Sequence, residues 1–89
     1  MKESGQAVDV ICICDASGEI RPLRMRVEQQ DQSRVRIDID EVVSTQRVSY
    51  VGAEANIYLC RAQVSGREKL FELKYQFRSH CWQLLQNLC

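Results

Sequence analysis

The main pattern along the chain is a strict alternation of apolar and polar residues, which is typical of β-strands with one buried face. It is clearest in two segments, 23–28 and 34–39, which flank a polar loop. These segments predict a first hairpin. Its inward-facing residues are expected to be Leu23, Met25, Val27, Val35, Ile37 and Ile39.

Charge selects the register of this hairpin, because alternation alone allows more than one. One register places Glu28 opposite Arg34 and Arg24 opposite Asp38. A slide to the next allowed register sets arginine against arginine instead. Cross-strand pairs contribute ~0.2–1 kcal/mol, and like charges opposite each other are unfavourable. We therefore predict the first register.

A second hairpin is predicted across Ser65–Gly66, because a tight loop that contains glycine favours this connection. Alternating rows on both sides of the turn place Cys60 opposite Phe71 and Tyr58 opposite Leu73. Both apolar rows then lie on the same face. This hairpin is expected to supply most of the core.

The chain is expected to turn again at 78–81, which sets Trp82 opposite Phe77 and Leu84 opposite Tyr75. A helix over 70–88 is the competing interpretation, and the unbroken alternation argues against it; a short helical turn near the end of the chain stays open. The predicted core is Tyr58, Cys60, Phe71, Leu73, Tyr75, Phe77, Trp82 and Leu84.

The N-terminal run 8–14 is apolar on both faces, which predicts a strand that is covered on both sides. A hairpin turn is expected at 15–19. Pro22 has no N–H to donate to a strand neighbour, so it marks an edge or a bulge near the start of the next strand. The pattern is weakest over 42–56, where it indicates a strand ending near a turn at Gly52.

These elements predict an all-β fold of about five or six short antiparallel strands. A small, partly closed antiparallel barrel, an SH3-like meander, is the most economical way for so short a chain to protect its strand edges. The chain is expected to form a single domain over 1–89, with 1–6 as a loose N-terminal arm.

Composition and charge narrow the classes of partner. Twelve basic and twelve acidic residues cancel, so a nucleic-acid or membrane partner would need a local charged patch. The apolar run 8–14 is too short for a signal-peptide core or a membrane span. Five cysteines are an odd number, which argues against a secreted disulfide scaffold. A cytoplasmic protein with reduced thiols and no membrane partner is expected.

Two stretches, "EIRPLRMRVE" and "GREKLFELKYQFRSHCWQL", carry a resemblance. The chain resembles a group of small, uncharacterised β-rich proteins from Firmicutes. In that group a strand of the form I-x-P-L/M-x-x-R precedes a G-R-x-K-x-x-E/R-L-x-Y strand and a late tryptophan. The resemblance implies a bacterial protein, and it offers no catalytic residue to carry over.

The residues most suggestive of chemistry do not form a catalytic or metal site. His80 and Cys81 are neighbours, and neighbours in an extended chain point to opposite faces, so they cannot form a catalytic pair. Cys12 and Cys14 lack the C-x2-4-C spacing of structural zinc sites and are interpreted as core residues. We expect no enzyme, no metal ligand and no cofactor.

The candidate binding residues are arginines on the outer face of the first hairpin: Arg24, Arg26, Arg34 and Arg36. Arginine suits bidentate contacts with phosphate. However, acidic residues interleave with these arginines, and that face has no aromatic residue on which a base could stack. In the predicted register Arg26 and Arg36 lie side by side without an acid between them, which suits a carboxylate pair on a partner protein.

The sequence therefore predicts a non-enzymatic binding module whose partner is another protein or a second copy of itself. An exposed β-edge beside Pro22 would add backbone pairing with that partner. A weak nucleic-acid-binding accessory protein that uses the Arg-rich hairpin is the alternative, and a thiol or metal site is the third. No DNA binding is expected at ~0.15 M salt.

Overall fold

A computed structural model of the chain describes residues 5–87, with the side chains of Tyr50, Gln86 and Asn87 left out. Within this part every regular element is a β-strand, which confirms the all-β prediction. The strands are β1 (Gln6–Ala7), β2 (Asp9–Cys14), β3 (Ile20–Glu28), β4 (Arg34–Asp38), β5 (Glu41–Tyr50), β6 (Ala53–Val64), β7 (Arg67–Gln76) and β8 (Cys81–Asn87).

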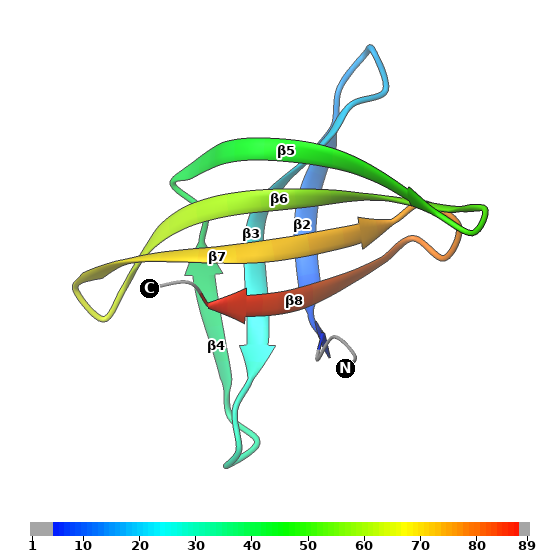
Figure 1. The fold of residues 1–89 in the computed structure, drawn as a ribbon. Coiled ribbons are helices and arrows are strands. Elements are labelled where there is room, and N and C mark those ends of the chain that lie inside the picture. The colour runs from blue at the N-terminus through cyan, green and yellow to red at the C-terminus, as the bar shows by residue number, and fades with distance from the viewer. Residues whose placement is uncertain (1–4, 88–89) are drawn as a thin grey trace.

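The strands form two antiparallel sheets. One has five strands in the order β1-β8-β7-β6-β5, and the other has three in the order β2-β3-β4. Figure 1 shows β5 to β8 running across the view and the three-stranded sheet behind them at a steep angle. The ladders divide into two sheets and form no closed barrel, so the SH3-like barrel stays a prediction.

The chain passes between the sheets at corners where backbone hydrogen bonds continue. At the first corner, between β1 and β2, the N–H of Val8 donates to the carbonyl of Trp82 at 3.3 Å. At the second, between β4 and β5, the N–H of Asp40 donates to the carbonyl of Arg61 at 2.9 Å. At each corner a residue between two strands thus continues the hydrogen bonding of the five-stranded sheet toward the three-stranded one.

The core lies between the sheets and is built from the residues that alternation places inward on β6 and β7. Its buried hydrophobic residues are Met25, Ala55, Tyr58, Cys60, Ala62, Phe71, Leu73, Tyr75 and Trp82. The Trp82 ring lies against both tyrosines, with ring centroids 4.8 Å from Tyr75 and 5.5 Å from Tyr58. The predicted core is confirmed, with Phe77 and Leu84 only partly buried at its margin.

The predicted registers of the first two hairpins are confirmed. Arg24 lies opposite Asp38 between β3 and β4, and Cys60 lies opposite Phe71 between β6 and β7. The turn at Ser65–Gly66 has positive φ angles of 54° and 78°. Two successive left-handed residues give a two-residue turn whose twist matches that of the flanking strands. This match explains why the turn sets the register between β6 and β7.

The predicted register between β7 and β8 is wrong by one pleat. Tyr75, not Phe77, lies opposite Trp82. The turn occupies 77–80 instead of 78–81: His80 adopts a left-handed φ of 58°, and its N–H donates to the carbonyl of Gln76 at 2.9 Å. Phe77 therefore leaves the β7–β8 ladder.

A bulge shifts the inward row of β3. Ile11 lies opposite Arg24 and Cys12 lies opposite Pro22, so Leu23 is an extra residue on β3. The predicted inward position of Leu23 is wrong, because the extra residue reverses the alternation: Leu23 is 42% exposed and Pro22 is fully buried. The prediction that Pro22 marks a bulge is confirmed.

The prediction that 8–14 is covered on both faces is also wrong. Among the described strands, β2 is the outer strand of its sheet and has β3 as its one neighbour there. Ile11 is 56% exposed and Ile13 is 42% exposed, and both Cys12 and Cys14 are exposed.

The weakly patterned stretch 42–56 is more regular than expected. β5 already begins at Glu41, and the turn predicted at Gly52 is confirmed, with positive φ at Val51 and Gly52. The predicted arm 1–6 lies mostly outside the described residues, although Gln6 pairs with Leu84. The helical turn left open near the C-terminus is replaced by β8 as far as Asn87.

Candidate binding surfaces

Acids pair with two of the four arginines on the outer face of the three-stranded sheet. Arg24 contacts Asp38 at 2.7 Å, and Arg26 contacts Asp9 at 2.7 Å. The expectation that Arg26 and Arg36 have no acid beside them is wrong, because β2 places Asp9 next to Arg26. Arg26 holds the pKa of Asp9 below its usual value through a hydrogen bond and its charge. Among the described residues, the other two arginines of this set, Arg34 and Arg36, form no ion pair.

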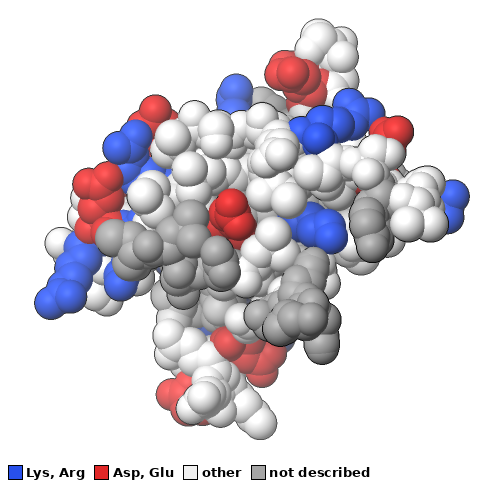
Figure 2. Space-filling view, viewed as in Figure 1, with Lys and Arg blue, Asp and Glu red and all other residues white. Residues whose placement is uncertain are grey.

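Arg34, the fourth predicted binding residue, lies opposite Glu28 as expected. On the face of the molecule seen in Figure 2, acidic and basic side chains are interspersed over the surface. This mixture of signs differs from the continuous basic stripe that nucleic-acid backbones require.

The outer edge of β2 is a second candidate surface. The N–H of Val8 points away from β3, toward β8. Backbone polar groups alternate in direction along a strand, so those of Val10, Cys12 and Cys14 point the same way. Beyond Val8 the described strands supply no neighbour on this side. The three residues therefore present a row of unpaired backbone donors and acceptors.

Nothing in the composition of β2 protects this edge. Natural edge strands usually carry lysine, proline or a bulge that discourages pairing with another chain. From Val10 to Cys14 the side chains are apolar or thiol, and Ile11 and Ile13 are largely exposed. The bulge in this sheet lies on β3 and leaves β2 straight. Within residues 5–87, β2 thus presents an exposed strand edge without these protecting features.

The thiols near this edge do not form a catalytic pair. The hydroxyl of Tyr75 lies 2.9 Å from Nδ1 of His80, and Sγ of Cys81 lies 3.4 Å from the carbonyl of Ser79. Burial raises the pKa of Tyr75 first, and the charges of nearby cysteine thiolates raise it further. His80 is thus partnered by a phenol, as expected for a turn residue.

The prediction that Cys12 and Cys14 are core residues is wrong, because β2 lies at the surface. Burial of Cys12 and the charge of Cys14 raise the pKa of Cys12. Cys60 is the buried thiol, and desolvation raises its pKa to about 12. Among residues 5–87 no group of three or more potential ligands is placed to hold a metal ion.

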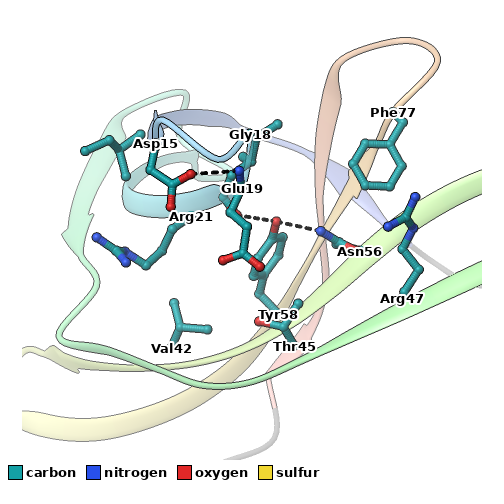
Figure 3. Close-up of a pocket in the computed structure, with 12 residues that line it drawn as sticks. Asp15, Gly18, Glu19, Arg21, Val42, Thr45, Arg47, Asn56, Tyr58 and Phe77 are labelled. Carbon is teal, nitrogen blue, oxygen red and sulfur yellow. Dashed lines mark hydrogen bonds between the residues drawn. The ribbon is translucent and has the colours of Figure 1, made fainter.

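A cleft of about 520 Å³ opens between the β2–β3 hairpin and the end of β5, and it is the third candidate surface. It is lined by Ile13, Asp15, Gly18, Glu19, Ile20, Arg21, Val42, Thr45, Arg47, Asn56, Tyr58 and Phe77. Figure 3 shows Glu19 and Tyr58 near its centre, Arg21 at one side, and Arg47 with Phe77 at the other. We name it the β3–β5 cleft.

Tyr58 holds the floor of this cleft. Its hydroxyl donates to the carbonyl of Ile20 at 2.6 Å and accepts a hydrogen bond from Nδ2 of Asn56 at 3.0 Å (Figure 3). The carbonyl of Ile20 lies where β3 has no strand partner other than β2. The Tyr58 hydroxyl thus supplies the Ile20 carbonyl with the donor that a neighbouring strand would otherwise provide.

Arg47 is fixed at the far end of the cleft. Its guanidinium carbon lies 4.8 Å from the ring centroid of Phe77, and its Nη2 donates to Glu54 at 2.8 Å. Phe77 is itself held by its N–H, which donates to the carbonyl of Glu54 at 3.1 Å. A cation–π contact and an ion pair together favour this orientation of the exposed arginine.

Sequence reasoning missed the cleft. Thr45 and Arg47 fall in the stretch whose pattern was weakest, and Phe77 was assigned to the core. One signal was present: Asn56 lies two residues before Tyr58 on the inward-facing side of β6, where a polar residue interrupts an apolar row. A polar residue at an inward position indicates that the core is open to solvent there or that the residue lines a binding site.

Comparison of the chain with known protein families, with curated proteins and with solved structures finds no match. The resemblance to small Firmicutes proteins therefore stays a prediction. In the described part of the chain no helix is long and apolar enough to cross a membrane.

Proposed function

We propose that the protein is a non-enzymatic binding module that recruits an extended segment of another protein onto the free edge of β2. The observation that carries this proposal is the exposure of β2: its residues 10–14 are apolar or thiol, and its outer side pairs with no strand among residues 5–87. Strand addition is a common way for a sheet to bind a peptide, with main-chain hydrogen bonds giving affinity and side chains giving specificity.

The surroundings of β2 indicate the chemistry of the partner. The backbone groups of Val10, Cys12 and Cys14 would pair with the added strand. Ile11 lies in a shallow depression that Arg26 and Arg36 also line. A partner side chain over Ile11 would be apolar, and a carboxylate beside it would reach the unpaired Arg36.

We further propose that the two sheets form one partly closed, SH3-like meander. The backbone hydrogen bonds at both corners support this arrangement. We also propose a cytoplasmic, bacterial protein, supported by the odd number of cysteines and the resemblance above. Nucleic-acid binding is the weaker candidate because acids pair with two of the four arginines and leave no continuous basic stripe.

The test uses a capped extended peptide, acetyl-Lys-Val-Thr-Val-Thr-Val-Lys-amide, labelled for fluorescence anisotropy. We expect binding at about millimolar peptide or tighter, because a short unanchored strand contributes mainly backbone pairing. The variant Cys12→Pro removes an outward-facing N–H and should abolish binding while retaining the fold, since proline is tolerated on strand edges. The matched control Cys12→Val should bind as the parent does.

Equal binding by Cys12→Pro, with its circular dichroism unchanged, would refute the proposal. If that variant does not fold, Ile11→Lys with Ile13→Lys takes its place, because edge lysines oppose strand pairing. Salt-sensitive binding of a labelled oligonucleotide at ~0.15 M salt, lost in Arg26→Glu/Arg36→Glu, would favour the nucleic-acid alternative.

A further inference from the structure

We propose that the β3–β5 cleft is a separate binding site for a short zwitterionic peptide of about dipeptide size. The cleft volume of about 520 Å³ falls within the usual ~300–1,000 Å³ range of ligand sites. The site is distinct from the outer edge of β2 and does not depend on strand addition there.

The carboxylate position is assigned by Arg47. Glu54 and the ring of Phe77 hold its guanidinium at the wall of the cleft. Only Nη2 donates a hydrogen bond to a protein group within residues 5–87, so Nε and Nη1 stay available. A preoriented guanidinium with free donors is suited to a carboxylate, which it can bind bidentately.

The ammonium position is assigned by Glu19. Its side chain reaches over Tyr58 in the middle of the cleft (Figure 3). In the described part of the chain the Glu19 carboxylate accepts no hydrogen bond and forms no ion pair. Oδ1 of Asn56 is a further acceptor, because Asn56 uses its Nδ2 to bond Tyr58. These acceptors lie between Arg47 and Arg21.

The peptide group between the two charges finds partners on the edge of β5. Tyr50 and Ala53 close a two-residue turn, so alternate residues from Tyr50 back along β5 bond to β6. The backbone groups of Thr45 and Arg47 then face away from β6, on the side where β5 has no strand neighbour. They can pair with the amide of a bound peptide.

The balance of charge and polarity favours a zwitterion over a simple anion or cation. The lining residues include Asp15 and Glu19 as well as Arg21 and Arg47, so the cleft has no net charge. Asp15 is already engaged by the N–H groups of its own turn. Apolar side chains of a ligand would contact Ile20 and Val42.

The experiment titrates the full chain with three matched probes by isothermal calorimetry: Leu-Leu, N-acetyl-Leu-Leu and Leu-Leu-amide. The acetyl group removes the ammonium charge, and the amide removes the carboxylate. We expect Leu-Leu to bind and each analogue to bind at least about tenfold more weakly. Equal affinity of all three probes, or no heat with Leu-Leu at about 10 mM, would overturn the proposal.

Two variants locate the site. Glu19→Gln should weaken Leu-Leu by about tenfold and leave the weak affinity of N-acetyl-Leu-Leu unchanged, because that probe has no ammonium to lose. The matched control Glu28→Gln, at the other end of β3, should change the affinity for neither probe. An equal loss of Leu-Leu affinity in Glu19→Gln and Glu28→Gln would place the binding site outside the cleft. A loss of Leu-Leu affinity in Cys12→Pro would do the same, and either result would contradict the assignment.

Discussion

At the scale of single residues, Tyr58 connects the core to the β3–β5 cleft. Its ring is buried in the core, while its hydroxyl bonds the carbonyl of Ile20 and Nδ2 of Asn56. Tyr58→Phe should keep the packing and lower the free energy of unfolding by about 1 kcal/mol, because the part-buried carbonyl of Ile20 loses its donor. Urea unfolding monitored by tryptophan fluorescence measures this; an unchanged midpoint would mean that water replaces the hydroxyl at no cost.

Asp15 illustrates how a surface turn responds to pH. Hydrogen bonds from Ser17 first, and then from the N–H of Glu19, hold its pKa below the ordinary 3.8. A carboxyl with a lowered folded pKa stabilises the fold above its unfolded pKa, and that stabilisation is lost as the pH falls through the folded value. When the pH is lowered from about 6 to about 2, the free energy of unfolding of Asp15→Asn should therefore fall less than that of the parent.

Thermal unfolding of the two proteins across this range checks the prediction. Asparagine can retain the turn through the same kind of side-chain hydrogen bond, so the variant should fold. Asp31→Asn serves as a parallel case, because Ser33 lowers the pKa of Asp31 in the same way. Identical pH profiles for the parent and both variants would contradict the account of these turns.

At the scale of elements, the sequence predicts both the position and the buried face of strands whose two faces differ, but for β2 it predicts only that a strand is present. β6 and β7 alternate cleanly, and the register between them follows from the turn at Ser65–Gly66. β2 is apolar on both faces, which is the pattern of a covered strand, yet it lies at the sheet edge. Alternation reports how many faces are apolar; it does not report whether anything covers them.

The β7–β8 register shows a second limit. Phe77 continues the alternation of β7, so the pattern alone extends the strand by one pleat too many. The left-handed conformation of His80 closes the turn earlier. A non-glycine residue with positive φ is uncommon, so composition located this turn only to within one residue.

The cysteines allow a test of where β2 lies. Exposed Cys14 and Cys81 should react rapidly with Ellman's reagent, whereas Cys60 should react only on unfolding, because it is buried and its pKa is raised to about 12. Cys12 is exposed but its pKa is raised, so its reaction should need a higher pH.

The measurement follows each thiol by mass spectrometry in a Cys89→Ser background, which removes the one cysteine outside the described residues. Protection of Cys12 and Cys14 equal to that of Cys60 would show that β2 is covered, and the proposed edge would then not exist.

At the scale of the whole molecule, the sequence predicts the fold class and most of the core, but the candidate surfaces depend on how the sheets meet. The arginine face shows why. The predicted pairing of Arg24 with Asp38 needs only the hairpin, whereas the pairing of Arg26 with Asp9 depends on the placement of β2 beside β3. The β3–β5 cleft likewise depends on the meeting of the sheets, because residues of both sheets line it.

The central claim is that β2 has an open edge that takes up an added strand, and residue-resolved amide hydrogen exchange tests it most directly. In the free protein the amides of Val10, Cys12 and Cys14 should exchange rapidly while that of Ile13 is protected, and the capped peptide should slow the three fast amides selectively. Uniform protection along β2 without peptide, or no change when the peptide is added, would contradict the account.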